Sequence, residues 1–275
     1  MTRTVKIQRG FTLVEAVAVI AITGILAAAV AVFIRAPVRG FVDSVRRAEM
    51  TDIADLALRR MERDVRLALP NSVRVDATGR FIEFLQTRSG GRYREEKDNN
   101  GAGNPLEFNV TDTKFDILGP LPALSSGDQL VVYNLGIPGA DAYAGNNNTA
   151  YTSLAGAEVT MSAKKFPFAS PGGRFHVVAT PVTYHCDLAN GVLRRYWGYA
   201  IQAAQPTNPA GVPLAGASSA ILAGHVSACS FTYDANVVAQ RAGLVTMRLG
   251  ITMATPDGQN ETVTLYHAAH VDNVP

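Results

Sequence analysis

The stretch that decides the fold is residues 10–34, which read GFTLVEAVAVIAITGILAAAVAVFI. From Ala16 to Ile34 this stretch has nineteen consecutive residues without a charged side chain. As a helix that rises about 1.5 Å per residue, the run is about 28 Å long. That length matches the roughly 30 Å hydrocarbon core of a bilayer. No other stretch of the sequence is both long and apolar enough to span a membrane, so we predict one membrane-spanning helix near the N-terminus.

The overall composition excludes several classes of protein. The 275 residues are 47% hydrophobic and 17% charged, with 25 Lys and Arg against 23 Asp and Glu. A disordered chain or a charged tail protein would be richer in charge, and a general nucleic-acid binder would have a strong basic surplus. Two cysteines are too few for a disulfide-dense miniature scaffold. The length fits one large domain or two small ones.

Three interpretations of the N-terminal segment compete. A secretory signal peptide fits the basic leader and the small residues from Ala27 to Ala31, although the apolar region of such a peptide normally has only about 7 to 15 residues. A plain signal anchor fits the length of the run. Neither explains Glu15, a carboxylate at the edge of the run. A charge in lipid is costly, so it marks a functional group with an expected partner.

The third interpretation explains this carboxylate. The string Arg9-Gly10-Phe11-Thr12-Leu13-Val14-Glu15 resembles the processing site of type IV prepilins and type II secretion pseudopilins. The resemblance implies that prepilin peptidase cuts between Gly10 and Phe11, and that Phe11 becomes the N-methylated first residue. It also implies that Glu15 neutralises the terminal amine of a neighbouring subunit, because a buried charge is tolerated only when it is paired.

The same resemblance implies the fold and the location. It implies an α+β, pilin-like fold, in which a long N-terminal helix with a membrane-spanning first half packs on an antiparallel β-rich head. The expected parts are a prepilin leader peptide (1–10), a transmembrane and filament-core helix (11–35), an amphipathic second half of the stem helix (36–70) and a periplasmic head (71–275). We expect a single span in the inner membrane, followed by incorporation into a pilus or pseudopilus filament at the cell surface.

A narrower resemblance extends along nearly the whole chain. Stretches such as 58–75, 195–199 and 227–233 resemble the O-type minor pilins of mannose-sensitive haemagglutinin (MSHA) pili. J-type pseudopilins and W-type minor pilins share the long helix and β-rich head, so a minor pseudopilin of a type II secretion system stays open as an alternative. Val32 stands where many major pilins have a proline, and the first proline is Pro37.

The resemblance also implies the partners. They are prepilin peptidase, other minor pilins, the major pilin and the inner-membrane assembly platform, with no nucleic acid.

The second half of the stem is expected to be an amphipathic helix. From Phe41 to Leu69 the chain has neither proline nor glycine, and Pro70 is expected to end the helix. The apolar residues recur at spacings of three and four and predict one buried face. That face comprises Met50, Ile53, Ala54, Ala57, Leu58, Met61, Val65 and Leu69. The charged block 57–66 is interpreted as a solvated face, with the favourable acid-first pairs Asp55–Arg59 and Glu62–Arg66 beside the apolar stripe.

The remainder of the chain predicts strands and turns. Apolar residues alternate from Val245 to Met253, and a strand at 262–271 follows a turn at 256–258. A second hairpin is expected from 175–186 and 192–201, joined by a segment that contains the turn signal Asn190-Gly191. Further candidate strands are 80–85, 129–135 and 226–233.

Two turn-rich stretches, 98–105 and 136–148, contain oxygen-bearing side chains such as those of Asp98 and Asp141. Some pseudopilins bind calcium through loops of the head. The spacing of a calcium-binding loop is missing from both stretches, so we interpret them as surface turns.

Cys186 and Cys229 are the only cysteines, and both fall in predicted strands. A domain exported to an oxidising compartment would allow them to form a disulfide, which we favour over two buried free thiols. The closed loop would stabilise the head by about 4 kcal/mol in the chain-entropy model.

No constellation of catalytic or metal-binding groups stands out in the sequence. His267 and His270 are three residues apart in a predicted strand, so their side chains are expected on opposite faces. Trp197 is interpreted as core or interface packing rather than as part of a glycan-binding surface. We therefore expect a structural protein without enzyme activity, cofactor or metal. A membrane-anchored periplasmic enzyme is the least supported alternative.

Overall fold

A computed structural model describes residues 10–235, 242–255 and 257–275. The predicted leader peptide therefore lies outside the described residues except for Gly10. The chain divides into two compact units, residues 1–49 and Met50–Pro275. The second unit begins inside the stem helix, at Met50. The functional boundaries at residues 10, 35 and 70 stay predictions.

The first element is the helix α1 (Leu13–Arg66), which continues through Pro37. A proline has no backbone N–H, so the Phe33 carbonyl lacks its i+4 donor at that point. The prediction that the helix continues to Leu69 was wrong, because α1 ends at Arg66. Beyond it, Ala68 forms an isolated antiparallel bridge with Gln86. The chain thus leaves the helix before Pro70 because its backbone pairs with a strand there.

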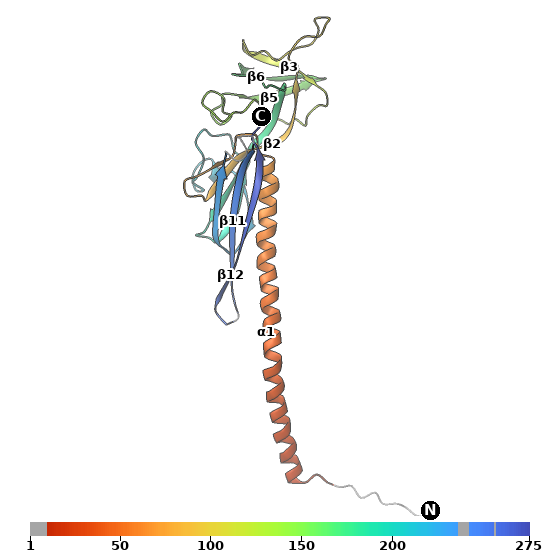
Figure 1. Cartoon of the computed structure of the whole chain (residues 1–275), viewed down its shortest axis with the longest axis vertical. Helices are drawn as coiled ribbons and strands as arrows, with labels where there is room; N and C mark the ends of the chain where they lie inside the picture. Colours follow the sequence, from red (N-terminus) through yellow and green to blue (C-terminus); the bar gives the residue numbers. More distant parts are fainter. Residues whose placement is uncertain (1–9, 236–241, 256) are drawn as a thin grey trace, which may run out of the picture. The chain divides into compact units, whose positions relative to one another are not determined.

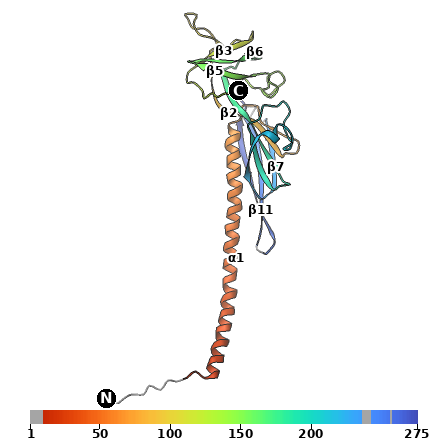
Figure 2. The same cartoon turned by 180° about the vertical axis from the view of Figure 1, so that it is seen from behind.

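The head is built from antiparallel strands, and the predicted α+β, pilin-like fold is confirmed (Figures 1 and 2). The strands are β1 (Arg74–Val75), β2 (Phe81–Tyr93), β3 (Asp112–Leu118), β4 (Gln129–Val132), β5 (Asn148–Ala155), β6 (Glu158–Lys164), β7 (Arg174–Asp187), β8 (Val192–Trp197), β9 (Ser218–Ala223), β10 (Val226–Asp234), β11 (Ala242–Ala254) and β12 (Asn260–Asp272). A 3-10 turn, η1 (Leu214–Gly216), precedes β9.

The strands form two sheets. Nine strands pair in the order β1-β2-β3-β6-β5-β4-β7-β8-β9, and β10-β11-β12 form a separate sheet. An additional pairing of β2 with β7 closes six strands of the larger sheet (β2, β3, β6, β5, β4 and β7) into a ring. The sequence did not predict this ring, because β3, β5 and β6 have no strong alternation.

The larger of the two main cores lies where α1 meets both sheets. The predicted apolar face of the helix is confirmed as its main buried surface. Six of its residues are almost completely buried in this core, and Ile53 packs at its edge; the six are Met50, Ala54, Ala57, Leu58, Met61 and Val65. The core also receives side chains from β2, β7 and β8 of the large sheet and from β10, β11 and β12 of the small one. The helix therefore holds the two sheets together by burying apolar surface, the dominant favourable contribution to folding.

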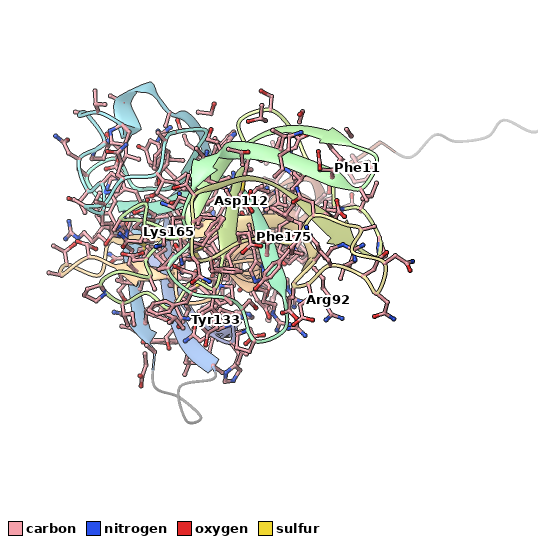
Figure 3. The ribbon with its side chains drawn as sticks, turned by 90° about the horizontal axis from the view of Figure 1, so that it is seen from above. Phe11, Arg92, Asp112, Tyr133, Lys165 and Phe175 are labelled. Carbon is pink, nitrogen blue, oxygen red and sulfur yellow. A yellow bond between two sulfur atoms is a disulfide. The ribbon has the colours of Figure 1, made fainter. Side chains whose placement is uncertain are left out.

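The second core fills the six-stranded ring. Phe115 and Phe175 meet edge to face with their ring centres 5.3 Å apart, and Tyr93 packs against Phe115. Figure 3 shows Phe175 near the middle of this end of the head and Arg92 toward the rim. A Cβ atom on Gly91 would lie 2.9 Å from the Phe175 ring, so only glycine leaves room for the ring at this position.

Both predicted hairpins are confirmed. β11 pairs with β12 from Ala242–Asp272 to Ala254–Asn260 without interruption, although Pro256 of the turn lies outside the described residues. β7 pairs with β8 across a turn in which Gly191 has a φ of 62°. That left-handed conformation explains the glycine of the Asn-Gly signal.

Asp64 departs from the prediction that the charged block 57–66 is a solvated face. It is 7% exposed, and its Oδ2 accepts hydrogen bonds from the Tyr184 hydroxyl at 2.7 Å and the Arg195 Nε at 2.8 Å. Arg60 lies 3.5 Å from its Oδ1. Tyr184 belongs to β7 and Arg195 to β8, so this carboxylate attaches the helix to the large sheet. The pairs Asp55–Arg59 and Glu62–Arg66 form as predicted.

Replacing Asp64 by alanine should lower the free energy of unfolding by about 3–5 kcal/mol, because it leaves Arg195 buried without its partner. Denaturant unfolding of the detergent-solubilised protein measures the change. The matched control is Asp55→Ala, which breaks an exposed pair and should cost no more than about 1 kcal/mol. Equal losses in the two variants would show that the Asp64 contact does not attach the helix to the sheet.

Candidate processing and assembly site

The predicted cleavage site lies just before α1. Gly10, Phe11 and Thr12 precede the helix, and the Phe11 side chain is 81% exposed. A Cβ atom built on Gly10 would have no atom within 4 Å. The Gly10–Phe11 peptide bond is therefore free of packing contacts in the described part of the chain, as a protease substrate needs to be.

Glu15 has a local structural role that the sequence analysis missed. Its Oε2 accepts hydrogen bonds from the Thr12 backbone N–H at 3.2 Å and the Thr12 hydroxyl at 3.0 Å. In return, the Glu15 backbone N–H donates to the Thr12 Oγ1 at 3.3 Å. This reciprocal arrangement is a capping box, and the pattern Thr-x-x-Glu at residues 12–15 was its signal in the sequence. The cap satisfies two backbone N–H groups at the start of the helix.

The helix beyond the cap presents an uninterrupted apolar surface. Residues 13–34 are all exposed, and their large apolar side chains include those of Val17, Ile20, Ile25 and Phe33. Among the described residues, α1 is the one helix whose length and composition would allow it to cross a membrane. The hydroxyl of Thr23 within the run bonds to the Val19 carbonyl at 2.6 Å, so this polar group needs no partner outside the helix.

In the head, Cys186 and Cys229 form a disulfide. Cys186 belongs to β7 and Cys229 to β10, so the bond joins the large sheet to the small one beside the α1 core. The cysteines are 43 residues apart, and closing such a loop stabilises a fold by about 4 kcal/mol in the chain-entropy model.

The fully buried Glu83 of β2 is the centre of a polar network. Its Oε2 accepts a hydrogen bond from the Arg74 Nε at 2.8 Å, and its Oε1 accepts one from the Tyr199 hydroxyl at 3.0 Å. The Arg74 guanidinium also lies 3.6 Å from the centre of the Tyr143 ring. Burial raises the pKa of Glu83 to about 7, although Arg74 and the hydrogen bonds oppose that rise.

The loops considered for calcium use their carboxylates locally. The Asp98 Oδ1 accepts the N–H groups of Asn100 and Ala102, and the Asp141 Oδ1 accepts that of Tyr143. Both arrangements are turns closed by an aspartate. Among the described residues, no group of three or more His, Cys, Asp or Glu side chains is placed to hold a metal ion.

Histidine and tryptophan side chains have structural contacts. The His267 Nε2 lies 2.7 Å from the Glu62 Oε2, which links β12 to α1. His185 stacks on Phe81 with ring centres 4.1 Å apart. Trp197 packs against the large core beside Arg195, in line with the packing role expected for it.

Comparison with known proteins bears on the N-terminal segment. Residues 5–31, about a tenth of the chain, match the family model described as the prokaryotic N-terminal methylation motif. Residues 5–31 therefore have a methylation motif like the one expected from the resemblance to type IV prepilins, and we call them the prepilin-type segment. Gly10, Phe11 and Glu15 all lie within this prepilin-type segment, as does the capping box that starts α1. No curated protein and no solved structure matches the chain significantly.

The Glu83 network predicts a pH-dependent stability. The pKa of Glu83 rises from 4.5 to about 7 on folding, so its contribution to stability is full below pH 4.5 and is lost as the pH rises through 7. Across that window the contribution should fall by about 3 kcal/mol. The free energy of unfolding, measured between pH 4 and 8, should therefore decrease with pH in the wild type. In Glu83→Gln this part of the pH dependence should be lost. The control is Glu158→Gln, which replaces a half-buried glutamate that pairs with Lys114 at the surface; an unchanged slope in Glu83→Gln would contradict the assignment.

Proposed function

We propose that this protein is a minor pilin-like structural subunit that takes part in the assembly or initiation of a type IV pilus. The observation that carries the proposal is the prepilin-type segment at residues 5–31, joined to a capped apolar helix and an antiparallel head. The segment supplies what a filament subunit needs, which is a membrane anchor before assembly and an apolar filament core after it.

In the proposed processing step, prepilin peptidase removes residues 1–10 and methylates the new N-terminus at Phe11. Glu15 then lies four residues after the residue that bears that amine. Inside an apolar filament, the amine of a neighbouring subunit needs a counter-charge, and Glu15 is the only acidic residue in residues 1–42. The proposed role of Glu15 is therefore to pair with a neighbouring N-terminus and set the position of one subunit against the next.

The proposed location is the inner membrane, with one span and the head in the periplasm, before transfer to a filament at the cell surface. The disulfide between Cys186 and Cys229 supports the periplasmic placement, because such bonds persist in oxidising compartments. The partners would be prepilin peptidase, other minor pilins, the major pilin and the inner-membrane assembly platform.

At the finer level, we propose an MSHA-like pilus as the client machine, because the narrower sequence resemblance covers both the stem and the head. A J-like minor pseudopilin of a type II secretion system is the alternative, since the prepilin-type segment is common to both. Pilus-biogenesis genes or secretion genes beside the coding sequence would separate the two. The nature of the segment favours a structural subunit over an enzyme.

The first test is the mass of the mature N-terminus. In cells with prepilin peptidase, we expect a chain that starts at N-methylated Phe11, and in cells without it a chain that still has residues 1–10. Mass spectrometry of the purified protein distinguishes these forms. A cut between Ala27 and Ala31 would instead identify a signal peptide and overturn the proposal.

A second test separates the charge of Glu15 from its capping role. Glu15→Gln keeps an acceptor for the Thr12 N–H but removes the charge, whereas Thr12→Ala removes the capping hydroxyl and keeps the charge. Filament assembly, measured by the amount of this protein in sheared filaments, should fall strongly in Glu15→Gln and much less in Thr12→Ala. The head should remain folded in both, with unchanged thermal unfolding. The opposite order would show that Glu15 acts through the cap rather than by charge pairing.

A further inference from the structure

An open cavity of about 460 Å³ lies at an interruption in the pairing of β7. β4 pairs with β7 as far as Val178, and pairing with β8 on the same side starts at Val182. The three residues between them, Ala179–Pro181, have no strand partner on this side and line the cavity. The interruption arises because the chain enters β4 and leaves β8 at this point, so that neither strand extends across it.

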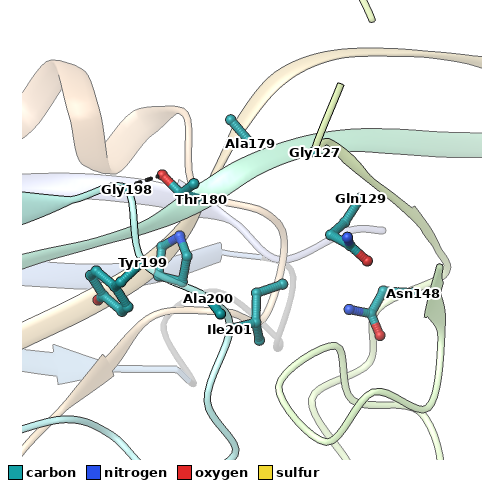
Figure 4. A pocket seen from close by; sticks show the side chains of 10 residues that line it. Gly127, Gln129, Asn148, Ala179, Thr180, Gly198, Tyr199, Ala200 and Ile201 are labelled. Carbon is teal, nitrogen blue, oxygen red and sulfur yellow. Dashed lines mark hydrogen bonds between the residues drawn. The ribbon is translucent and has the colours of Figure 1, made fainter. Parts of the chain in front are cut away.

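The lining of the cavity is polar but uncharged. None of the residues that line it has an ionisable acid or base other than the tyrosine hydroxyl of Tyr199. The carboxamides of Gln129 and Asn148 make no hydrogen bond to the described residues, and Figure 4 shows them together on one side of the cavity. Tyr199, Ala200 and Ile201 lie on the other side (Figure 4).

The walls of the cavity are fixed by the fold. The Gly198 N–H donates to the Thr180 Oγ1 at 3.2 Å, and the Tyr199 hydroxyl is held by Glu83 and Thr183 at 3.0 and 2.6 Å. Ile201 packs against the small buried cluster around Leu85 and Val178. A cavity that is already formed costs little conformational entropy when a ligand binds.

We propose that this cavity binds an extended, uncharged peptide segment of a partner protein. A carboxamide has the donor and acceptor of a peptide group, so Gln129 and Asn148 match the main chain of such a segment. The three-residue gap in the pairing of β7 is a place where the main chain of an extended peptide can join a sheet. Three residues without a strand partner correspond to about 10 Å of strand, the length of a three-residue segment.

Charge selects the class of peptide. A charged side chain placed in the cavity would lose water without gaining an opposite charge, which is unfavourable. The segment that binds is therefore neutral over the residues inside the cavity. The proposal concerns the head alone and does not depend on processing of the N-terminus.

The test uses the full-length protein in deuterated detergent and saturation-transfer NMR. The probes are the capped peptide acetyl-Ala-Thr-Ala-amide, its charged analogue acetyl-Ala-Asp-Ala-amide, and methyl glucoside as a neutral sugar. We expect saturation transfer to the neutral peptide only. Binding should weaken at least about tenfold in the double variant Gln129→Ala/Asn148→Ala, through the loss of two hydrogen-bonding groups.

Two further variants complete the test. Asn99→Ala removes a carboxamide from an exposed loop outside the cavity and should bind like the wild type. Ala200→Trp fills the cavity from an exposed position and should abolish binding while the thermal unfolding temperature stays unchanged. The proposal is overturned if the wild type binds none of the probes, if it binds the sugar or the charged peptide as well as the neutral one, or if the cavity variants bind normally.

Discussion

The burial of one face of α1 between two sheets is the interaction on which the head depends. The helix contributes methionine, alanine, leucine and valine side chains from Met50 to Val65. Small residues such as Ala54 and Ala57 allow the strands to approach the helix closely. Neither sheet alone covers its apolar face, because the large core draws on strands of both. The helix, the disulfide between β7 and β10 and the Asp64 contact to β7 and β8 thus all join parts of the same core.

The polar contacts around this core specify how the apolar surfaces meet. The carboxylate of Asp64 accepts hydrogen bonds from two strands of the large sheet, while Glu62 meets His267 of the small sheet. Apolar packing is non-directional, whereas these hydrogen bonds have a defined geometry. Because they bond to different sheets, Glu62 and Asp64 fix the register of the helix against each of them.

The first part of α1 is chemically different from the part that packs in the head. Its apolar side chains are exposed all around the helix. A continuous apolar surface of this size is unstable in water unless a partner covers it. A bilayer and a filament core both supply such cover. The capping box between Thr12 and Glu15 closes the backbone at the start of this segment, and backbone groups in an apolar medium need internal partners. The same glutamate thus caps the helix locally, and the proposed pairing with a neighbouring amine would use the same carboxylate.

Several features could be predicted from the sequence because they depend on neighbours along the chain. The apolar face of the helix follows from a period of 3.6 residues, and the β11–β12 hairpin follows from alternation. Asp64 comes seven residues after Ala57 and therefore lies on the same apolar face of the helix. This position indicated that Asp64 is buried, but the many charged residues around it led to the opposite prediction. The capping box was equally readable as Thr-x-x-Glu.

Other features depend on contacts between distant segments. The closure of six strands into a ring requires β2 to pair with both β3 and β7. The Glu83 network joins Arg74 to Tyr199, and the end of α1 at Arg66 reflects pairing of the next residues with β2. The sequence by itself determined the prepilin-type N-terminus, the membrane-length helix and its buried face, since periodicity and short motifs act over one or two turns. Only the tertiary structure decided the strand order, the buried charges and the cavity beside β7, because these arise where backbone and side chains far apart in sequence compete for the same partners.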